Sequence, residues 1–235
     1  MRYKSVFISD LHIGSSHAKI EKILMFFKDS EFENLYLVGD IIDGWLLEKR
    51  FHWPRPANLF LQKILRLSRK NINITYLPGN HDSFLDEFEG VDFGGIKIQK
   101  QVEYNSIKQG RILVLHGHQF DGIISFCPRL QKVGAYFYEL SVFVNSLLRL
   151  IGIKWSFSSF LKRKAKEAVK FVTSYKNAIT SYCIDNGYQG VIIGHLHWPE
   201  MDNYCGIKYY NIGDLVESNT ILVETLEGEI KLVKL

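Results

Sequence analysis

Five short apolar runs in this chain are each followed by side chains that bind metal ions. Each run has the length and the Val, Ile and Leu content of a buried strand. The runs, each with the residues that follow it, are Val6–Ile8 before Asp10 and His12, Leu35–Val38 before Asp40, Ile74–Leu77 before Asn80, Ile112–Leu115 before His116, and Val191–Ile193 before His195 and His197. In open α/β sheets, ligands bind beyond the carboxyl ends of the strands, where residues distant in sequence converge. The sequence therefore predicts one site assembled from all five strand ends.

The composition is typical of a single globular domain. The chain has 235 residues, of which 46% are hydrophobic, enough for one substantial core. The cysteines Cys127, Cys183 and Cys205 are odd in number and lack CxxC spacing, so neither a disulfide framework nor a structural zinc site is predicted.

Cellular context and partners are predicted from the start of the chain and its charge. The first residues enter an apolar strand without a signal core, so we expect a cytoplasmic protein. The net charge of +4 favours an anionic partner, either a phosphorylated small molecule or an acidic surface such as the inner face of the cell membrane. No nucleic-acid polymer is expected as a partner.

Alternating strands and helices predict an α/β fold. Amphipathic helices are predicted at His17–Lys28 and Asn58–Lys70, each between two of the strands. After Asp82 further segments have strand composition: Ile96–Ile98, Val102–Tyr104, Ile207–Tyr210, Thr220–Glu224 and Ile230–Val233. Two packed sheets flanked by helices would accommodate all of these elements.

A helical insert is predicted at about residues 125–183. Apolar residues recur at helical spacing over Leu130–Ile151 and again over Leu161–Ile179. Polar residues interrupt the first series, so it does not predict a membrane span. The second helix places Ser159, Arg163 and Lys166 on one face, where they would either bind the substrate's phosphate or sugar or simply face solvent.

The types of ligand indicate which metals the site would hold. Aspartate, asparagine and histidine together suit Mn, Fe or Zn, and we expect two divalent ions, with manganese favoured. Two ions 3.5 to 4 Å apart need a shared carboxylate, for which Asp40 is the candidate. Each motif alone could be a helix cap or a turn, but this explanation would have to hold separately at all five strand ends.

These motifs, in this order, resemble those of the calcineurin-like metallophosphoesterases. The resemblance rests on Asp10-x-His12, Gly39-Asp40-x-x-Asp43, Gly79-Asn80-His81-Asp82, His116-Gly117 and Gly194-His195-x-His197. It implies a four-layer αββα sandwich and a dinuclear metal site. One metal would be held by Asp10, His12, Asp40 and His197, and the other by Asp40, Asn80, His116 and His195.

The catalytic group expected beside the metals is His81. It follows the predicted ligand Asn80, so it would reach a phosphoryl group and either stabilise its charge or protonate the leaving oxygen. Asp43 or Asp82 would orient its ring, and Asp43 matches the family's partner aspartate. Asn80, His81 and His195 are also expected to contact the substrate.

A narrower resemblance is to UDP-2,3-diacylglucosamine pyrophosphatase-like proteins. It rests on Asp43-Gly44-Trp45, Trp53-Pro54, the predicted helical insert, Tyr210-Asn211-Ile212-Gly213-Asp214 and Val216-Glu217-Ser218. It implies cleavage of a UDP-linked, doubly acylated glucosamine to UMP and a lipid monophosphate in lipid A assembly, with the insert as a lid that binds acyl chains.

The chain departs from this narrower group at two positions. The lipid A enzymes read Gly-Asn-Arg-Asp where this chain has His81, and His118 replaces an aspartate that usually follows His-Gly. A phosphodiesterase for a soluble nucleotide or another non-lipid phosphoester is therefore an alternative. A non-catalytic metal-binding scaffold is a second alternative. The presence of a suitable side chain at all seven predicted ligand positions argues against it.

Overall fold

The computed structural model describes the backbone of residues 1–123 and 157–235 and the side chains of residues 1–121 and 169–235. The chain forms two compact units, one of Met1–Gln119 with Ile179–Leu235 and one of Phe120–Ala178. The predicted insert, at about residues 125–183, overlaps the range of the second unit in sequence. The predicted helix at Leu130–Ile151, Cys127, and the side chains of Ser159, Arg163 and Lys166 lie outside the described residues.

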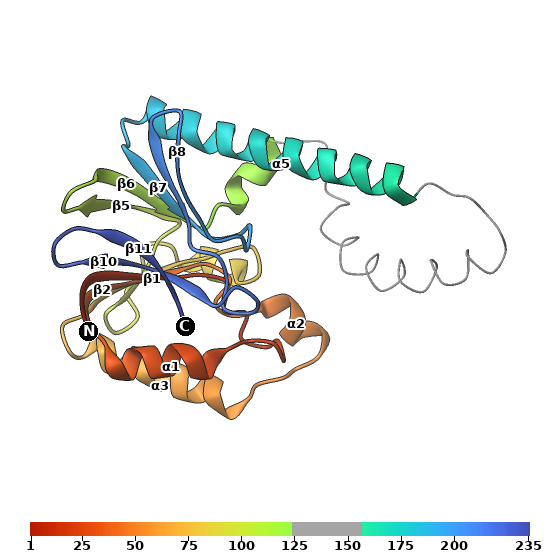
Figure 1. The fold of residues 1–235 in the computed structure, drawn as a ribbon. Helices are drawn as coiled ribbons and strands as arrows, with labels where there is room; N and C mark the ends of the chain where they lie inside the picture. The colour runs from red at the N-terminus through yellow and green to blue at the C-terminus, as the bar shows by residue number, and fades with distance from the viewer. Residues whose placement is uncertain (124–156) are drawn as a thin grey trace. The chain divides into compact units, whose positions relative to one another are not determined.

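The first unit contains two sheets, as predicted (Figure 1). The six-stranded sheet has the order β11-β10-β1-β2-β3-β4, in which β1 to β4 are parallel and β10 and β11 are antiparallel to their neighbours. Its strands are β1 (Arg2–Ile8), β2 (Glu31–Val38), β3 (Asn73–Leu77), β4 (Ile96–Ile98), β10 (Thr220–Thr225) and β11 (Ile230–Lys234).

The five-stranded sheet has the order β5-β6-β7-β9-β8. Its three central strands are parallel, and the edge strands β5 and β8 are antiparallel to them. The strands are β5 (Gln101–Ser106), β6 (Gly110–Leu115), β7 (Gly190–Ile193), β8 (Glu200–Tyr204) and β9 (Ile207–Asn211). The sequence did not predict β8, because this edge strand is mostly exposed and polar.

Two helices, α1 (Ile20–Asp29) and α3 (Arg55–Ser68), lie side by side against the six-stranded sheet (Figure 1). The structure begins α1 three residues later than His17, because residues before it form turns in which Ala18 N–H donates to Ser15 O. It begins α3 earlier than Asn58, since a proline in the first turn is compatible with helix initiation.

The remaining helices of the described residues are a short α2 (Gly44–Lys49), two 3₁₀ helices (Ser83–Phe88 and His118–Ile123) and α5 (Phe157–Asp185). Helix α5 contains the second predicted helix of the insert. No helix in the described part of the chain has both the length and the apolar composition that a bilayer-spanning segment requires.

Alternating side chains on β1 place it between two hydrophobic clusters. Val6 and Ile8 pack in a cluster with residues of α1 and α3, including Ile23 and Phe60. Phe7 points to the opposite face and packs in a second cluster with residues of both sheets. Because both faces of the strand are buried, its register is fixed, and so is the point at which the chain leaves the sheet.

Candidate dinuclear metal centre

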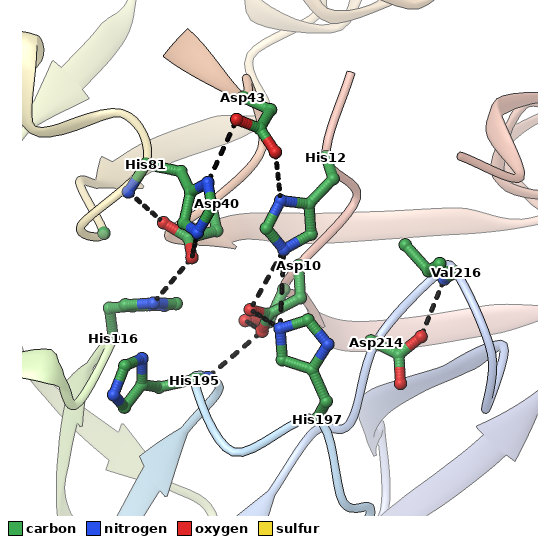
Figure 2. A network of polar contacts seen from close by, with 12 residues as sticks. Asp10, His12, Asp40, Asp43, His81, His116, His195, His197, Asp214 and Val216 are labelled. Atoms are coloured by element: carbon green, nitrogen blue, oxygen red, sulfur yellow. Dashed lines mark hydrogen bonds and ion pairs between the residues drawn. The ribbon is translucent and has the colours of Figure 1, made fainter. Parts of the chain in front are cut away.

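The predicted ligand residues converge at the carboxyl ends of five strands. Loops after β1, β2 and β3 of one sheet and after β6 and β7 of the other bring their polar side chains together (Figure 2). Among the described residues, three groups of carboxylate and imidazole atoms have the spacing of a metal site: Asp10, His12 and His197; Asp10, Asp40 and His116; and His12, Asp43 and His81.

In the first group, three side-chain atoms point toward one another. Oδ1 of Asp10 lies 3.0 Å from Nε2 of His197 and 3.8 Å from Nε2 of His12, and the two Nε2 atoms are 3.4 Å apart. Figure 2 shows both rings turned toward this carboxylate. The other oxygen of Asp10 is occupied by the Ser9 hydroxyl and the backbone N–H of His195. One oxygen and two nitrogens are thus left facing a common point.

The second group is centred on Asp40. Nε2 of His116 lies 3.3 Å from Oδ2 of Asp40, while Nδ1 of the same ring donates to the Val38 carbonyl oxygen at 2.9 Å. That hydrogen bond fixes the tautomer in which Nε2 is free to bind a metal ion. Both side chains are almost fully buried.

The electrostatics of the first two groups indicate a site that binds cations. Burial lowers the pKa of His12, but Asp10 and Asp43 outweigh it and raise the pKa to about 10. Burial likewise lowers the pKa of His116, and Asp40 and Asp10 raise it to about 9. Burial raises the pKa of Asp10, yet His12 and His197 bring it well below its usual value. These imidazoles retain protons so strongly because the buried carboxylates attract positive charge.

Buried polar atoms that make no hydrogen bond supply a direct test of whether metal ions fit the site. Among the described residues, the buried atoms Asp10 Oδ1, Asn80 Oδ1 and His116 Nε2 make no hydrogen bond, although Asp10 Oδ1 and His116 Nε2 lie at ion-pair distance from His197 and Asp40. Buried polar atoms are rarely left unpaired, and those without a protein partner indicate a bound ion or water. Oxygen and imidazole nitrogen atoms are the donors that Mn, Fe and Zn accept. The residues therefore fit divalent metal ions.

His195 and His118 lie beside the second group. The His195 ring centroid is 5.2 Å from that of His116, and the His118 ring centroid is 5.5 Å from that of His116 and 6.4 Å from that of His195. His118, which replaces the aspartate expected after His-Gly, thus contributes a third imidazole at this edge of the site.

His81 is oriented by Asp43. Nδ1 of His81 lies 3.0 Å from Oδ1 of Asp43, and its Nε2 lies 4.0 Å from Oδ2 of Asp40. The ring also packs against Trp45, with centroids 4.2 Å apart. Burial raises the pKa of Asp43, but contacts with His12 and His81 hold it below its usual value. Asp43 therefore stays ionised and able to hold His81.

The other sequence candidate for orienting His81, Asp82, points away from that ring. It is fully buried, and its carboxylate accepts from Gly79 N–H, Ile41 N–H and the Tyr76 hydroxyl. Burial and the neighbouring Asp40 raise its pKa, although Tyr76 and Gly79 act in the opposite direction. Of the two aspartates, the one that contacts His81 is Asp43.

The backbone at five of the predicted ligands is unusual. Asp10, His12, Asp40, His195 and His197 have φ angles of 51°, 50°, 53°, 63° and 54°. Residues other than glycine rarely adopt this left-handed region, which costs about 1–2 kcal/mol each. The surrounding hydrogen bonds hold them there; for example, His12 N–H donates to Asp40 O at 2.9 Å. Such strain is often found at functional sites.

Two further residues that support the site were given no role in it by the sequence analysis, although Asp214 stands in a motif quoted there. Ser9 contacts Asp10, and its only sequence signal is a hydroxyl at the end of an otherwise apolar strand. Asp214, after β9, accepts from Val216 N–H at 2.7 Å and so shapes a loop near His197 (Figure 2). In that loop Leu215 N–H donates to Asp10 O at 3.0 Å, which braces the first ligand.

Comparison with known proteins agrees with this geometry. A UDP-2,3-diacylglucosamine hydrolase of Shewanella sp. (strain MR-7) is 24% identical over 96% of this chain and 95% of its own length. One from Psychromonas ingrahamii is 26% identical over 98% of this chain and 96% of its own length. The crystal structure of a hypothetical protein from Pyrococcus horikoshii, 14% identical, covers 100% of this chain and 88% of that chain with a TM-score of 0.53, and thus shares the fold.

The profile of the calcineurin-like phosphoesterases matches residues 3–199, which is most of the chain and a range that includes every predicted ligand. This match agrees with the order of the motifs and with the convergence of their side chains. The chain belongs to the calcineurin-like phosphoesterase family.

Proposed function

We propose that this protein is a two-metal hydrolase that cleaves the pyrophosphate bond of UDP-2,3-diacylglucosamine or a similar UDP-sugar lipid, releasing UMP and a lipid monophosphate. The observation that carries the phosphoester chemistry is the pair of ligand groups sharing Asp10, with the His81–Asp43 pair beside them. The relatives named for this substrate, which align over almost the whole chain, support the lipid assignment.

We assign one ion to Asp10, His12, Asp40 and His197 and the other to Asp40, Asn80, His116 and His195. Manganese is our preferred metal because the set mixes carboxylate, amide and imidazole donors, with iron and zinc as alternatives. Bound divalent ions would supply Lewis acidity to the phosphoryl oxygens and to the attacking water.

His81 is the proton donor to the leaving oxygen in this proposal. Its Nε2 faces the carboxylate of Asp40, on the side of the ligand groups, while Asp43 holds Nδ1. A ring fixed at one nitrogen presents the other in a constant position, which is what proton transfer requires. Asn80, His81 and His195 would also contact the phosphoryl group.

Apolar side chains beside His81 support a lipid substrate. Trp45, Leu46 and Phe84 are 45%, 39% and 50% exposed, and Trp45 packs on His81. Phe84 lies next to Gly44, the first residue of the helix that carries the other two. Exposed apolar groups clustered at a polar site favour a ligand with an apolar portion. We accordingly propose peripheral contact with the inner face of the cell membrane, which the net charge of +4 favours.

The second candidate is a phosphodiesterase acting on a soluble nucleotide. The observation that favours it is His81 itself, which stands where the lipid A enzymes carry arginine and which contacts Asp43 at 3.0 Å. An imidazole can transfer a proton but carries less fixed charge than a guanidinium. A site with histidine here would therefore suit a substrate with a smaller anionic group than the pyrophosphate of a UDP-sugar lipid.

A matched pair of substrates tests the proposal. UDP-glucosamine derivatives with and without acyl chains would be compared in detergent with Mn²⁺-loaded protein, with UMP detected by mass spectrometry. We expect kcat/KM to be at least about tenfold higher for the acylated substrate, because burying two methylenes contributes about 1.6 kcal/mol. Equal rates would favour the soluble substrate. A metal-loaded protein inert toward both substrates and toward bis-p-nitrophenyl phosphate would be a scaffold.

A further inference from the structure

We propose that Asp82 is a positioning residue that sets the geometry of the metal centre from within the protein. It would fix Asp40, the ligand shared by both proposed ions, and hold the loop of Asn80 and His81 against it. The inference rests on the proposed metal site, but it concerns the loops of this chain and can be measured without substrate.

The contacts of Asp82 join two ligand loops. Oδ1 accepts from Gly79 N–H at 2.5 Å in the loop after β3 and from Asp40 N–H at 3.2 Å in the loop after β2. Oδ2 accepts from Ile41 N–H at 2.8 Å and Ile42 N–H at 3.4 Å. The Tyr76 hydroxyl donates to Oδ2 at 2.5 Å.

Three successive amides of the β2 loop therefore surround one carboxylate. Asp40 has a φ of 53°, and a left-handed residue followed by further amides forms a concavity that binds anions. Here the anion is a side chain of the neighbouring loop. Asp82 thus satisfies amides that the left-handed turn at Asp40 directs inward, and it stabilises that turn.

A reciprocal contact completes the brace. The backbone N–H of His81 donates to Oδ1 of Asp40 at 2.8 Å. Each loop therefore supplies one aspartate whose carboxylate accepts backbone amides of the other loop. With that oxygen occupied, Oδ2 of Asp40 is the atom that faces His116 at 3.3 Å. The brace consequently decides which oxygen of Asp40 is presented to a metal ion.

Only an acidic side chain of this length satisfies the arrangement. Both oxygens of Asp82 face donors, so an asparagine placed there would direct its NH₂ group against N–H donors in either orientation. The side chain does not cap the 3₁₀ helix that begins at Ser83, so helix capping does not account for the aspartate.

The first test uses the unmodified protein without metal. Hydrogen exchange of the Gly79 and Ile41 amides would be compared with that of amides within β2. We expect these loop amides to be protected to a similar degree, because Asp82 holds them. Exchange of the Gly79 and Ile41 amides at the rate of an unprotected amide would overturn the proposal.

The second test measures Mn²⁺ affinity by calorimetry in variants whose circular dichroism matches the wild type. Asp82→Asn should weaken affinity by about 10- to 100-fold, the usual effect of losing a residue that supports a ligand. Tyr76→Phe should cause a smaller loss, since four backbone donors remain. Asp86→Asn, in the 3₁₀ helix that follows Asp82 but outside the brace, should bind as the wild type does.

Turnover of bis-p-nitrophenyl phosphate at saturating Mn²⁺ gives a further readout. A lower kcat with a nearly unchanged KM is expected for Asp82→Asn, because Asp40 and His81 would be misplaced. Wild-type Mn²⁺ affinity in a folded Asp82→Asn variant would refute the positioning role. If that variant does not fold, the exchange experiment and Tyr76→Phe decide. Failure of the lipid substrate assignment would leave the affinity and exchange results unaffected.

Discussion

Oδ1 of Asp43 lies 3.0 Å from Nδ1 of His81. The other oxygen of the same carboxylate lies 3.0 Å from Nδ1 of His12, and Leu46 N–H donates to Asp43 at 2.9 Å at the start of α2. One side chain thus orients a proposed metal ligand and the proposed proton donor together. Any change at Asp43 should therefore affect metal binding and proton transfer together.

For Asp43→Asn we expect kcat to fall about 10- to 100-fold and Mn²⁺ affinity to weaken by about tenfold, since both imidazoles lose their carboxylate. Steady-state kinetics and calorimetry would measure the two effects. His81→Gln is the comparison variant: it should lose rate but keep its metal. Metal loss in His81→Gln would show that His81 is a ligand.

Asp40→Ala should abolish metal binding and turnover together. Asp40 is buried, faces His116 and accepts the His81 amide, so no neighbouring group can replace it. Elemental analysis of reconstituted protein and hydrolysis of bis-p-nitrophenyl phosphate would test this. A variant that retains two ions per chain would contradict the assignment of Asp40 as the shared ligand.

The metal-free protein should lose stability as pH rises above neutrality. The pKa values of His12 and His116 are raised to about 10 and about 9, so protonation of these imidazoles stabilises the fold. This contribution is complete below their unfolded pKa of about 6.5 and is lost as pH rises through about 9 to 10. Thermal unfolding between pH 6 and 10 would show a falling Tm. Saturating Mn²⁺ should remove the fall, because it takes the place of the protons. A metal-free Tm that rises over this range would contradict the prediction.

Gly79→Ala should lower protein stability and Mn²⁺ affinity more than an ordinary glycine substitution does. A Cβ there would lie 2.3 Å from Oδ1 of Asp40 and 2.7 Å from the His116 ring. We expect a loss of about 1–3 kcal/mol in the free energy of unfolding, typical of overpacking, and weaker Mn²⁺ binding. Gly90→Ala is the control, since a Cβ there meets nothing within 4 Å and would add only backbone strain. Equal metal affinity in both variants would contradict this account.

Trp45→Ala should distinguish the two candidate substrates. If the indole contacts an acyl chain, KM for the acylated UDP-sugar should rise about tenfold, while KM for the unacylated one changes little. Met25→Ala removes a similarly exposed apolar side chain on α1 and should affect neither substrate. An equal rise for both substrates would show that Trp45 acts only through His81.

The ligand-bearing strand ends could be predicted because each one combines two local signals, an apolar run and a polar residue directly after it. The structure brings Asp10, Asp40 and His116 together as this pattern predicts. The choice between Asp43 and Asp82 could not be made from sequence, because Asp82 adjoins His81 in the chain while Asp43 follows another strand whose end is predicted to reach the same site. It depends on the direction in which each carboxylate points, which the amides of another loop decide.

Elements with weak local patterns were also missed. Helix α2 has only six residues, too few for helical periodicity to be recognised. It begins directly after Asp43, which the sequence analysis interpreted as the partner of a catalytic histidine and not as the start of a helix. The start of α1 was wrong because it depends on a contact between Lys19 N–H and Leu215 O, almost two hundred residues apart. Such long-range contacts leave no trace in a local window of sequence.

The left-handed conformation of five proposed ligand residues has a consequence for laboratory evolution. Glycine or asparagine would occupy these positions with less strain than aspartate or histidine. A screen that rewards heat resistance alone should therefore accumulate such replacements at these positions, because each would relax the backbone. A stabilised descendant of this chain would tend to lose its metals, so engineering for robustness has to select for catalysis in every round.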